Sequence, residues 1–103
     1  MGTVVPFRPR SGPWHPLECA GLVAIQRELE RHGLMTNYAQ ADDDGKPWRA
    51  FFSQMTGRVV AIVSRSKLGY ELVWADRTSA HAEKIDELIL VARTSTVRLH
   101  ASA

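Results

Sequence analysis

The sequence is poor in the residues that build disulfides and membrane spans. It contains one cysteine in 103 residues, so an intrachain disulfide is excluded and a reducing compartment is favoured. No apolar run approaches the roughly 18 residues of a membrane span. The N-terminus also lacks the apolar segment of a signal peptide. These absences predict a cytoplasmic protein that does not bind membranes.

Recurring catalytic and metal-binding motifs are absent as well. His15 and Cys19 have the spacing of two metal ligands, but zinc usually takes at least three protein ligands and the other histidines are scattered. The acidic run 42–45 fails the calcium-loop pattern, because Gln40 and Phe51 occupy positions that require acids. We therefore predict no catalytic residue, cofactor or metal site. No residue pattern in the sequence favours an enzyme.

Length and composition are those of one small globular domain. Hydrophobic residues make up 45% of the chain and charged residues 23%, which is ordinary for this class. The 13 basic and 11 acidic residues leave a net charge of only +2, less than a dedicated DNA-binding domain usually carries. A core of this size is thin, and a partner often completes such a core, so a homodimer is a reasonable expectation.

Residues 1–15 are predicted to form an extended, flexible arm. Proline recurs along this segment, where it removes backbone donors and disfavours helix in the residue before it. Phe7 and Trp14 are apolar enough to dock on a partner or on the domain, while Arg8 and Arg10 make the arm basic. A disordered tail and a short binding motif both fit this composition.

Two helices are predicted to flank the rest of the chain. The first runs from Pro16 to residue 32, because proline suits the first helical turn and Gly33 suits the C-terminal cap. The second is capped by Thr78 or Ser79 and runs to about Thr94. Residues 34–46 are predicted to be a connection that ends in a turn.

Three apolar runs between the helices predict three antiparallel strands at 47–54, 59–65 and 70–75. The order is therefore helix, three-stranded meander, helix (αβββα). This is a small α+β domain over residues 16–96, followed by a tail at 97–103.

The hairpin turns fix a register for this meander. With Thr56–Gly57 and Lys67–Leu68 at the turn centres, one face of the sheet is rich in aromatic residues and is predicted to pack on the helices. Its members are Trp48, Ala50, Phe52, Val59, Ala61, Val63, Tyr70, Leu72 and Trp74. The opposite face keeps an apolar row at Phe51, Ile62 and Val73, with Val60 and Ala75 beside it.

This second face predicts a protein interface, because a monomer rarely exposes a contiguous apolar row. The candidate interface residues are Phe51, Val60, Ile62 and Val73 on the sheet, with Phe7 and Trp14 on the arm. The main hypothesis is a non-enzymatic interaction or regulatory module that binds itself or another protein. Alternatively, one helix covers each face, or the arm covers the row.

Two other functions remain as alternatives. A nucleic-acid-associated regulator would grip phosphates with a basic hairpin and the basic arm, using Arg8, Arg10, Arg58, Arg65 and Lys67. A small-molecule sensor or small enzyme would use a pocket between helix and sheet, lined by Trp48, Tyr70 and Trp74.

Two segments, VVPFRPR at 4–10 and GLMTNYAQ…DDGKPWRAFF at 33–52, resemble small uncharacterised bacterial proteins of the alphaproteobacterial type. Pro47–Trp48 followed by Phe51–Phe52 is the more distinctive part. The resemblance implies a bacterial, cytosolic origin and carries no activity or site residue.

Overall fold

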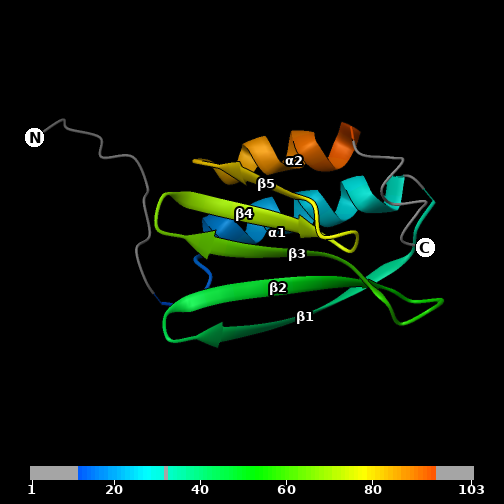
Figure 1. The fold of residues 1–103 in the computed structure, drawn as a ribbon, viewed down its shortest axis with the longest axis horizontal. Helices are drawn as coiled ribbons and strands as arrows, with labels where there is room; N and C mark the ends of the chain where they lie inside the picture. The colour runs from blue at the N-terminus through cyan, green and yellow to red at the C-terminus, as the bar shows by residue number, and fades with distance from the viewer. Residues whose placement is uncertain (1–11, 32, 95–103) are drawn as a thin grey trace, which may run out of the picture.

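Two helices and five strands follow one another along the chain in the computed structural model, which describes residues 12–31 and 33–94 (Figure 1). The elements are α1 (Pro16–Arg31), β1 (Thr36–Asp43), β2 (Lys46–Ser53), β3 (Val59–Ser66), β4 (Gly69–Trp74), β5 (Ser79–Ala82) and α2 (Ile85–Thr94). The prediction of a small α+β domain is confirmed. The order αβββα is wrong, because the meander has one more strand at each end.

The first unexpected strand is β1, which lies where a connection was predicted. It pairs with β2 in an unbroken antiparallel register from Thr36↔Ser53 to Asp43↔Lys46. Asp44 and Gly45 join the two strands with φ angles of 56° and 74°, the signature of a type I′ hairpin turn. β1 lacks an apolar alternation because every residue after Thr36 is exposed, so the pattern that identifies half-buried strands is missing.

The second unexpected strand, β5, replaces the predicted start of the second helix. Its residues pair with β4, from Tyr70↔Ala82 to Val73↔Ser79. Arg77, with φ of 70°, ends the short turn between these strands, a position that often needs a left-handed residue. Thr78 and Ser79 are therefore not helix caps, and α2 begins only at Ile85.

The strands form one antiparallel sheet in sequential order, β1-β2-β3-β4-β5, and both helices lie on the same side of it (Figure 1). One buried cluster joins the helices to this face, so the core is a single layer between helices and sheet. Its members are Leu22, Ile25 and Leu29 from α1, Leu88 and Ala92 from α2, and Phe51, Val60, Ala61, Val63, Tyr70, Leu72 and Trp74 from the sheet.

The helices approach closely where α1 carries a glycine. A Cβ at Gly21 would lie 2.6 Å from the Cγ2 of Ile85, too close for an unshifted side chain. Neither helix of the described part is long and apolar enough to cross a membrane.

The predicted register is right for one hairpin and wrong for the other. Ala61↔Trp74 and Ile62↔Val73 pair as predicted. In the preceding hairpin Phe51 pairs with Ala61, one residue away from the predicted partner, and the register shifts again between Phe51 and Phe52. The irregularity inserts Val60 between the paired positions of β3, as a β-bulge does.

This shift corrects the predicted faces of the sheet. Phe51 and Val60, both assigned to the open face, are completely buried in the core. Trp48, Ala50 and Phe52 were assigned to the core but lie on the open face. A register slip of one residue moves every side chain of a strand to the other face of the sheet. Val59, also assigned to the core, is 42% exposed.

Candidate functional site

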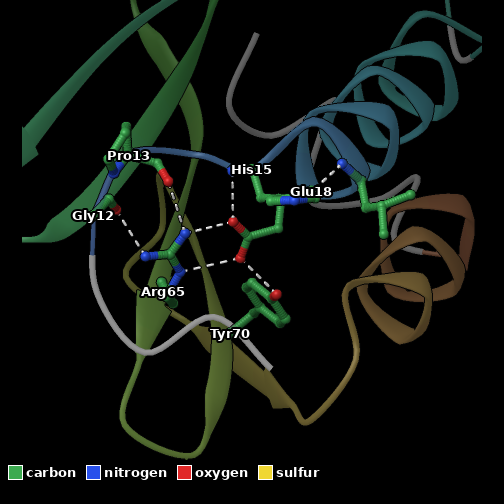
Figure 2. A network of polar contacts seen from close by, with 7 residues as sticks. Gly12, Pro13, His15, Glu18, Arg65 and Tyr70 are labelled. Atoms are coloured by element: carbon green, nitrogen blue, oxygen red, sulfur yellow. Dashed lines mark hydrogen bonds and ion pairs between the residues drawn. The ribbon is translucent and has the colours of Figure 1, made fainter. Parts of the chain in front are cut away.

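A buried polar network joins α1 to β3, β4 and the segment before α1 (Figure 2). Glu18 is 1% exposed and Arg65 is 6% exposed, so their charges are withdrawn from water. Arg65 Nε donates to Glu18 Oε2 at 3.0 Å, and its Nη2 pairs with Glu18 Oε1. Tyr70 donates its hydroxyl proton to Glu18 Oε2 at 2.7 Å, and the backbone N–H of His15 donates to Oε1 at 2.9 Å.

The same arginine holds the chain ahead of α1. Arg65 Nη1 donates to the carbonyl of Gly12 at 2.8 Å, and Nη2 donates to that of Pro13 at 3.1 Å. The guanidinium also lies 5.5 Å from the ring centroid of Trp14, which stacks on Tyr70 at 6.4 Å. Residues 12–15, predicted to belong to a flexible arm, are thus held in place by Arg65, Glu18 and Tyr70. Residues 1–11 lie outside the described chain.

The electrostatics of this network indicate a structural role. Burial alone would raise the pKa of Glu18, but the hydrogen bonds from Arg65, Tyr70 and His15, with the charge of Arg65, hold that pKa below its ordinary value. Burial and the Glu18 carboxylate raise the pKa of Tyr70. Each Glu18 oxygen already accepts two hydrogen bonds. The carboxylate therefore has no accessible position from which to act on a substrate.

The face of the sheet away from the helices carries a different feature, an apolar row that crosses four strands. Ala39, Ala50, Ile62 and Val73 are paired in turn across β1, β2, β3 and β4. Trp48 and Phe52 flank Ala50 on the same side of β2, since alternate residues of a strand share a face. We call these six residues, with Ala41 beside Trp48, the open-face patch. No helix or strand of the described chain lies over it (Figure 1).

Polar side chains that contact one another lie around the open-face patch and form its rim. Trp48 Nε1 donates to Asp43 Oδ2 at 3.0 Å, which fixes the indole on the face. Glu71 and His81 lie side by side on β4 and β5, with 3.2 Å between Oε2 and Nε2. Ala50 is only 8% exposed, whereas Trp48, Phe52, Ile62 and Val73 are half-buried and Ala39 and Ala41 are exposed. An apolar centre inside a polar rim is the usual composition of a protein interface.

The structure separates the predicted interface residues into three groups. Ile62 and Val73 lie on the open face, as predicted. Phe51 and Val60 belong to the core. Trp14 packs against the core and on Tyr70, and Phe7 lies outside the described residues.

The predicted basic hairpin is not assembled. Arg65 is buried and paired with Glu18, so it cannot reach a phosphate. Arg58 and Lys67 are exposed, but they lie beyond opposite ends of β3, and a strand of this length separates them by roughly 25–30 Å. Arg8 and Arg10 lie outside the described residues.

The described residues do not form the predicted helix–sheet pocket. Tyr70 and Trp74 are buried in the core, whereas Trp48 lies on the opposite face. A hollow of about 150 Å³ lies elsewhere, among Pro13, Trp14, Gln40, Ala41, Asp42 and Pro47. This volume is below the roughly 300 Å³ at which ligand pockets usually begin. The described residues contain no group of three or more potential metal ligands.

Sequence reasoning missed the Glu18–Arg65–Tyr70 network. Glu18 has an ordinary explanation in sequence, as an acid in the first turn of a helix, where the helix dipole favours negative charge. Arg65 stands near the end of a strand, where a solvated side chain is the usual outcome. The useful signal was the alternation of β3, which places Arg65 on the same face as Ala61 and Val63.

Comparison of the chain with protein-family models, with curated proteins and with solved structures gave no match. The resemblance to small alphaproteobacterial proteins stays a prediction.

Proposed function

We propose that this chain is a non-enzymatic protein-interaction module that docks a protein partner on the open-face patch. The observation that carries the proposal is the apolar row Ala39–Ala50–Ile62–Val73, which no element of the described chain covers. One face of an antiparallel sheet is commonly solvated, and such a face then alternates to polar residues. Here the central row stays apolar, and an aromatic residue stands on each side of it.

The area of the open-face patch determines how stable a complex it can form. Each of its seven residues occupies about 4.8 Å across the strands and about 6.7 Å along them, so the open-face patch covers roughly 225 Å² of the sheet. The largest apolar patch on a monomer is typically about 300–600 Å² and is often functional, so this patch is smaller than that. Two such surfaces bury less than the roughly 1,200 Å² of a standard stable interface, so this contact is reversible unless the partner also reaches the rim.

Ile62 and Trp48 are the residues from which we expect most of the binding energy. Ile62 lies in the middle strand and the middle row of the sheet. Trp48 is a large aromatic side chain that is already oriented by Asp43, so little side-chain entropy is lost on binding. Central, pre-ordered side chains of this kind dominate most interfaces.

A photo-crosslinking residue at Val73, introduced into the full chain in its native cells, tests the proposal. We expect it to capture one defined protein, and we expect capture to fall at least about tenfold when Ile62→Asp is added. Ser66→Asp, on the same strand but at the exposed end, is the matched control and should leave capture unchanged.

The Ile62→Asp chain should stay folded, because Ile62 is half-buried and its loss costs no more than about 2 kcal/mol. Circular dichroism of the purified variant checks this point. Capture from Val73 that is no stronger than from the exposed turn residue Thr56, or that survives Ile62→Asp, contradicts the proposal.

A further inference from the structure

The outer side of β1 is a second surface that no described strand or helix covers, and it is made of backbone rather than side chains. β1 is the edge strand of the sheet, and it is eight residues long and free of bulges. It has no proline, and no charged residue before Asp42. Natural proteins usually protect an edge with short strands, lysines, prolines or bulges, because an unprotected edge pairs with other strands. β1 has none of these features over residues 36–41.

The pairing of β1 with β2 shows which backbone groups face outward. The N–H of Gln54 donates to the carbonyl of Met35 at 3.0 Å, so Met35 and Gln54 form a hydrogen-bonded pair. Such pairs alternate along an antiparallel ladder, so the groups of Asn37, Ala39 and Ala41 face β2. The backbone groups of the residues between them, namely Thr36, Tyr38, Gln40 and Asp42, face away from the sheet. Pro47, which has no N–H, stands opposite Asp42, and this agrees with the assignment because a non-hydrogen-bonded pair needs no N–H from Pro47 to β1.

Only the first of these outward positions is already occupied. The N–H of Thr36 donates to Glu30 Oε2 at 3.4 Å, and its carbonyl accepts from Gln26 and Gln54. Within the described part of the chain, the N–H and carbonyl groups of Tyr38, Gln40 and Asp42 have no protein partner. They form a free edge that is long enough to pair with a short strand.

A buried charge lies beside this edge. Arg49 is 4% exposed, donates Nε and Nη2 to Gln40 Oε1 at 2.9 and 2.6 Å, and lies 4.0 Å over the ring of Tyr38. Both contacts are neutral, and Arg49 forms no ion pair with any residue the structure describes. A buried cation is normally paired with an anion, so a carboxylate that arrives next to Tyr38 would be stabilised.

From these observations we infer that two copies of this chain pair antiparallel through β1, with Gln40 on the two-fold axis, to form one continuous sheet. This register pairs Gln40 with Gln40 of the second copy, and Tyr38 with Asp42 of the second copy. Each of these outward-facing pairs can exchange two backbone hydrogen bonds. It also brings the second copy's Asp42 beside Tyr38, on the face where the Arg49 guanidinium lies. A register centred on Asp42 would oppose two aspartates and is disfavoured.

This interface is distinct from the open-face patch, and the inference does not depend on the proposed function. On the open face, Ala39 of one copy would stand opposite Ala41 of the other. The pairing therefore lengthens the apolar row without covering it.

Replacing Gln40 by proline tests directly whether the edge of β1 pairs with a second copy. Gln40→Pro removes an outward N–H and leaves the β1–β2 ladder intact, which is where an edge strand tolerates proline. Gln40→Ala is the matched control, because it removes the same side chain and keeps the N–H. By light scattering of the full chain we expect dimers for the wild type, Gln40→Ala and Ile62→Asp, and monomers for Gln40→Pro. A monomeric wild type, or a dimer that Ile62→Asp dissociates and Gln40→Pro does not, overturns the inference; the latter result would instead support the open-face patch.

The register has a test of its own. In a Cys19→Ser background, Ala39→Cys and Ala41→Cys chains should form a disulfide with each other on mild oxidation, because facing residues of a non-hydrogen-bonded pair have Cα atoms about 4.5 Å apart, within disulfide range. Neither chain should do so alone. Asp42→Asn should weaken the dimer about fivefold to tenfold, since two ion pairs are lost, whereas Asp44→Asn in the turn should not. Equal crosslinking of like and unlike chains, or pairing only with a different protein, contradicts the proposed dimer.

Discussion

Replacing Glu18 by glutamine should destabilise the fold strongly, although the two side chains have nearly the same shape. Both Glu18 oxygens accept from donors, Oε1 from the His15 N–H and Arg65, and Oε2 from Arg65 and Tyr70. Either orientation of the glutamine amide therefore directs its NH₂ group at a fixed donor. In addition, Arg65 keeps its charge and loses the one carboxylate partner that it has among the described residues.

The expected cost is about 3–5 kcal/mol, the usual effect of removing one member of a buried ion pair. Because a domain of this size is stable by only about 5–15 kcal/mol, a cost of this size is a large share of the total. With a urea m-value of about 1–2 kcal/mol per molar, the unfolding midpoint should fall by at least about 1.5 M. Urea titration followed by circular dichroism measures this shift.

Glu83→Gln is the matched control, since Glu83 is exposed. It should change the midpoint little. The double variant Glu18→Leu with Arg65→Met should be more stable than the sum of the single effects predicts, because no charge is left unpaired. A loss of less than about 1 kcal/mol for Glu18→Gln would show that the pair is solvated, and would refute the assignment of this network as the lock between α1, the sheet and residues 12–15.

The remaining predictions concern the core, acid stability and one turn. Phe51→Ala should lower the free energy of unfolding by about 3–5 kcal/mol and Ile62→Ala should lower it much less, because Phe51 is fully buried and Ile62 is not. Equal losses in urea titration would contradict the corrected register. The hydrogen bonds to Glu18 hold its pKa below the ordinary value despite burial, and on α1 the pKa of Glu28 is lowered by a hydrogen bond from Arg93 on α2, so the unfolded chain binds more protons in acid. Stability should be full above about pH 4.3 and fall as the pH drops below it; a flat acid profile would contradict this. Gly69→Ala should destabilise the protein by about 1–3 kcal/mol, because its Cβ would lie 2.2 Å from the carbonyl oxygen of Ala82 and φ is +147°; a neutral effect on the thermal midpoint would argue against this close approach.

The sequence identified the centre of the sheet and missed its edges. β3 and β4 have strong apolar patterns and a two-residue loop at Lys67–Leu68, so their register followed directly. β1 has exposed side chains on both faces after Thr36, and β5 is only four residues long. Short or exposed strands bury too little to leave a clear period in the sequence, and their pairing is decided by the neighbouring strand.

The open-face patch was located only in part because a β-bulge is not visible in the residue pattern. Val59 and Val60 suit a strand equally well, so the sequence does not show which of them leaves the ladder. That one residue decides whether Phe51 or Phe52 is buried. Ile62 and Val73 were placed correctly because they belong to the hairpin without the bulge.

The free edge of β1 is identified from backbone hydrogen bonding and not from the residue pattern. Its outward backbone groups follow from the phase of the hydrogen-bonded pairs, which one bond between Gln54 and Met35 sets. The environment of the buried Arg49 depends likewise on residues nine and eleven positions away, at Gln40 and Tyr38. Sequence alone gives neither.

The molar mass of the intact chain in solution is the most direct test of the claim that this protein works by association. Light scattering across a concentration series should show the mass rise from 11.5 kDa towards twice that value, and Gln40→Pro should hold it at the lower one. A wild-type chain that stays at 11.5 kDa over the whole series would contradict self-association through β1.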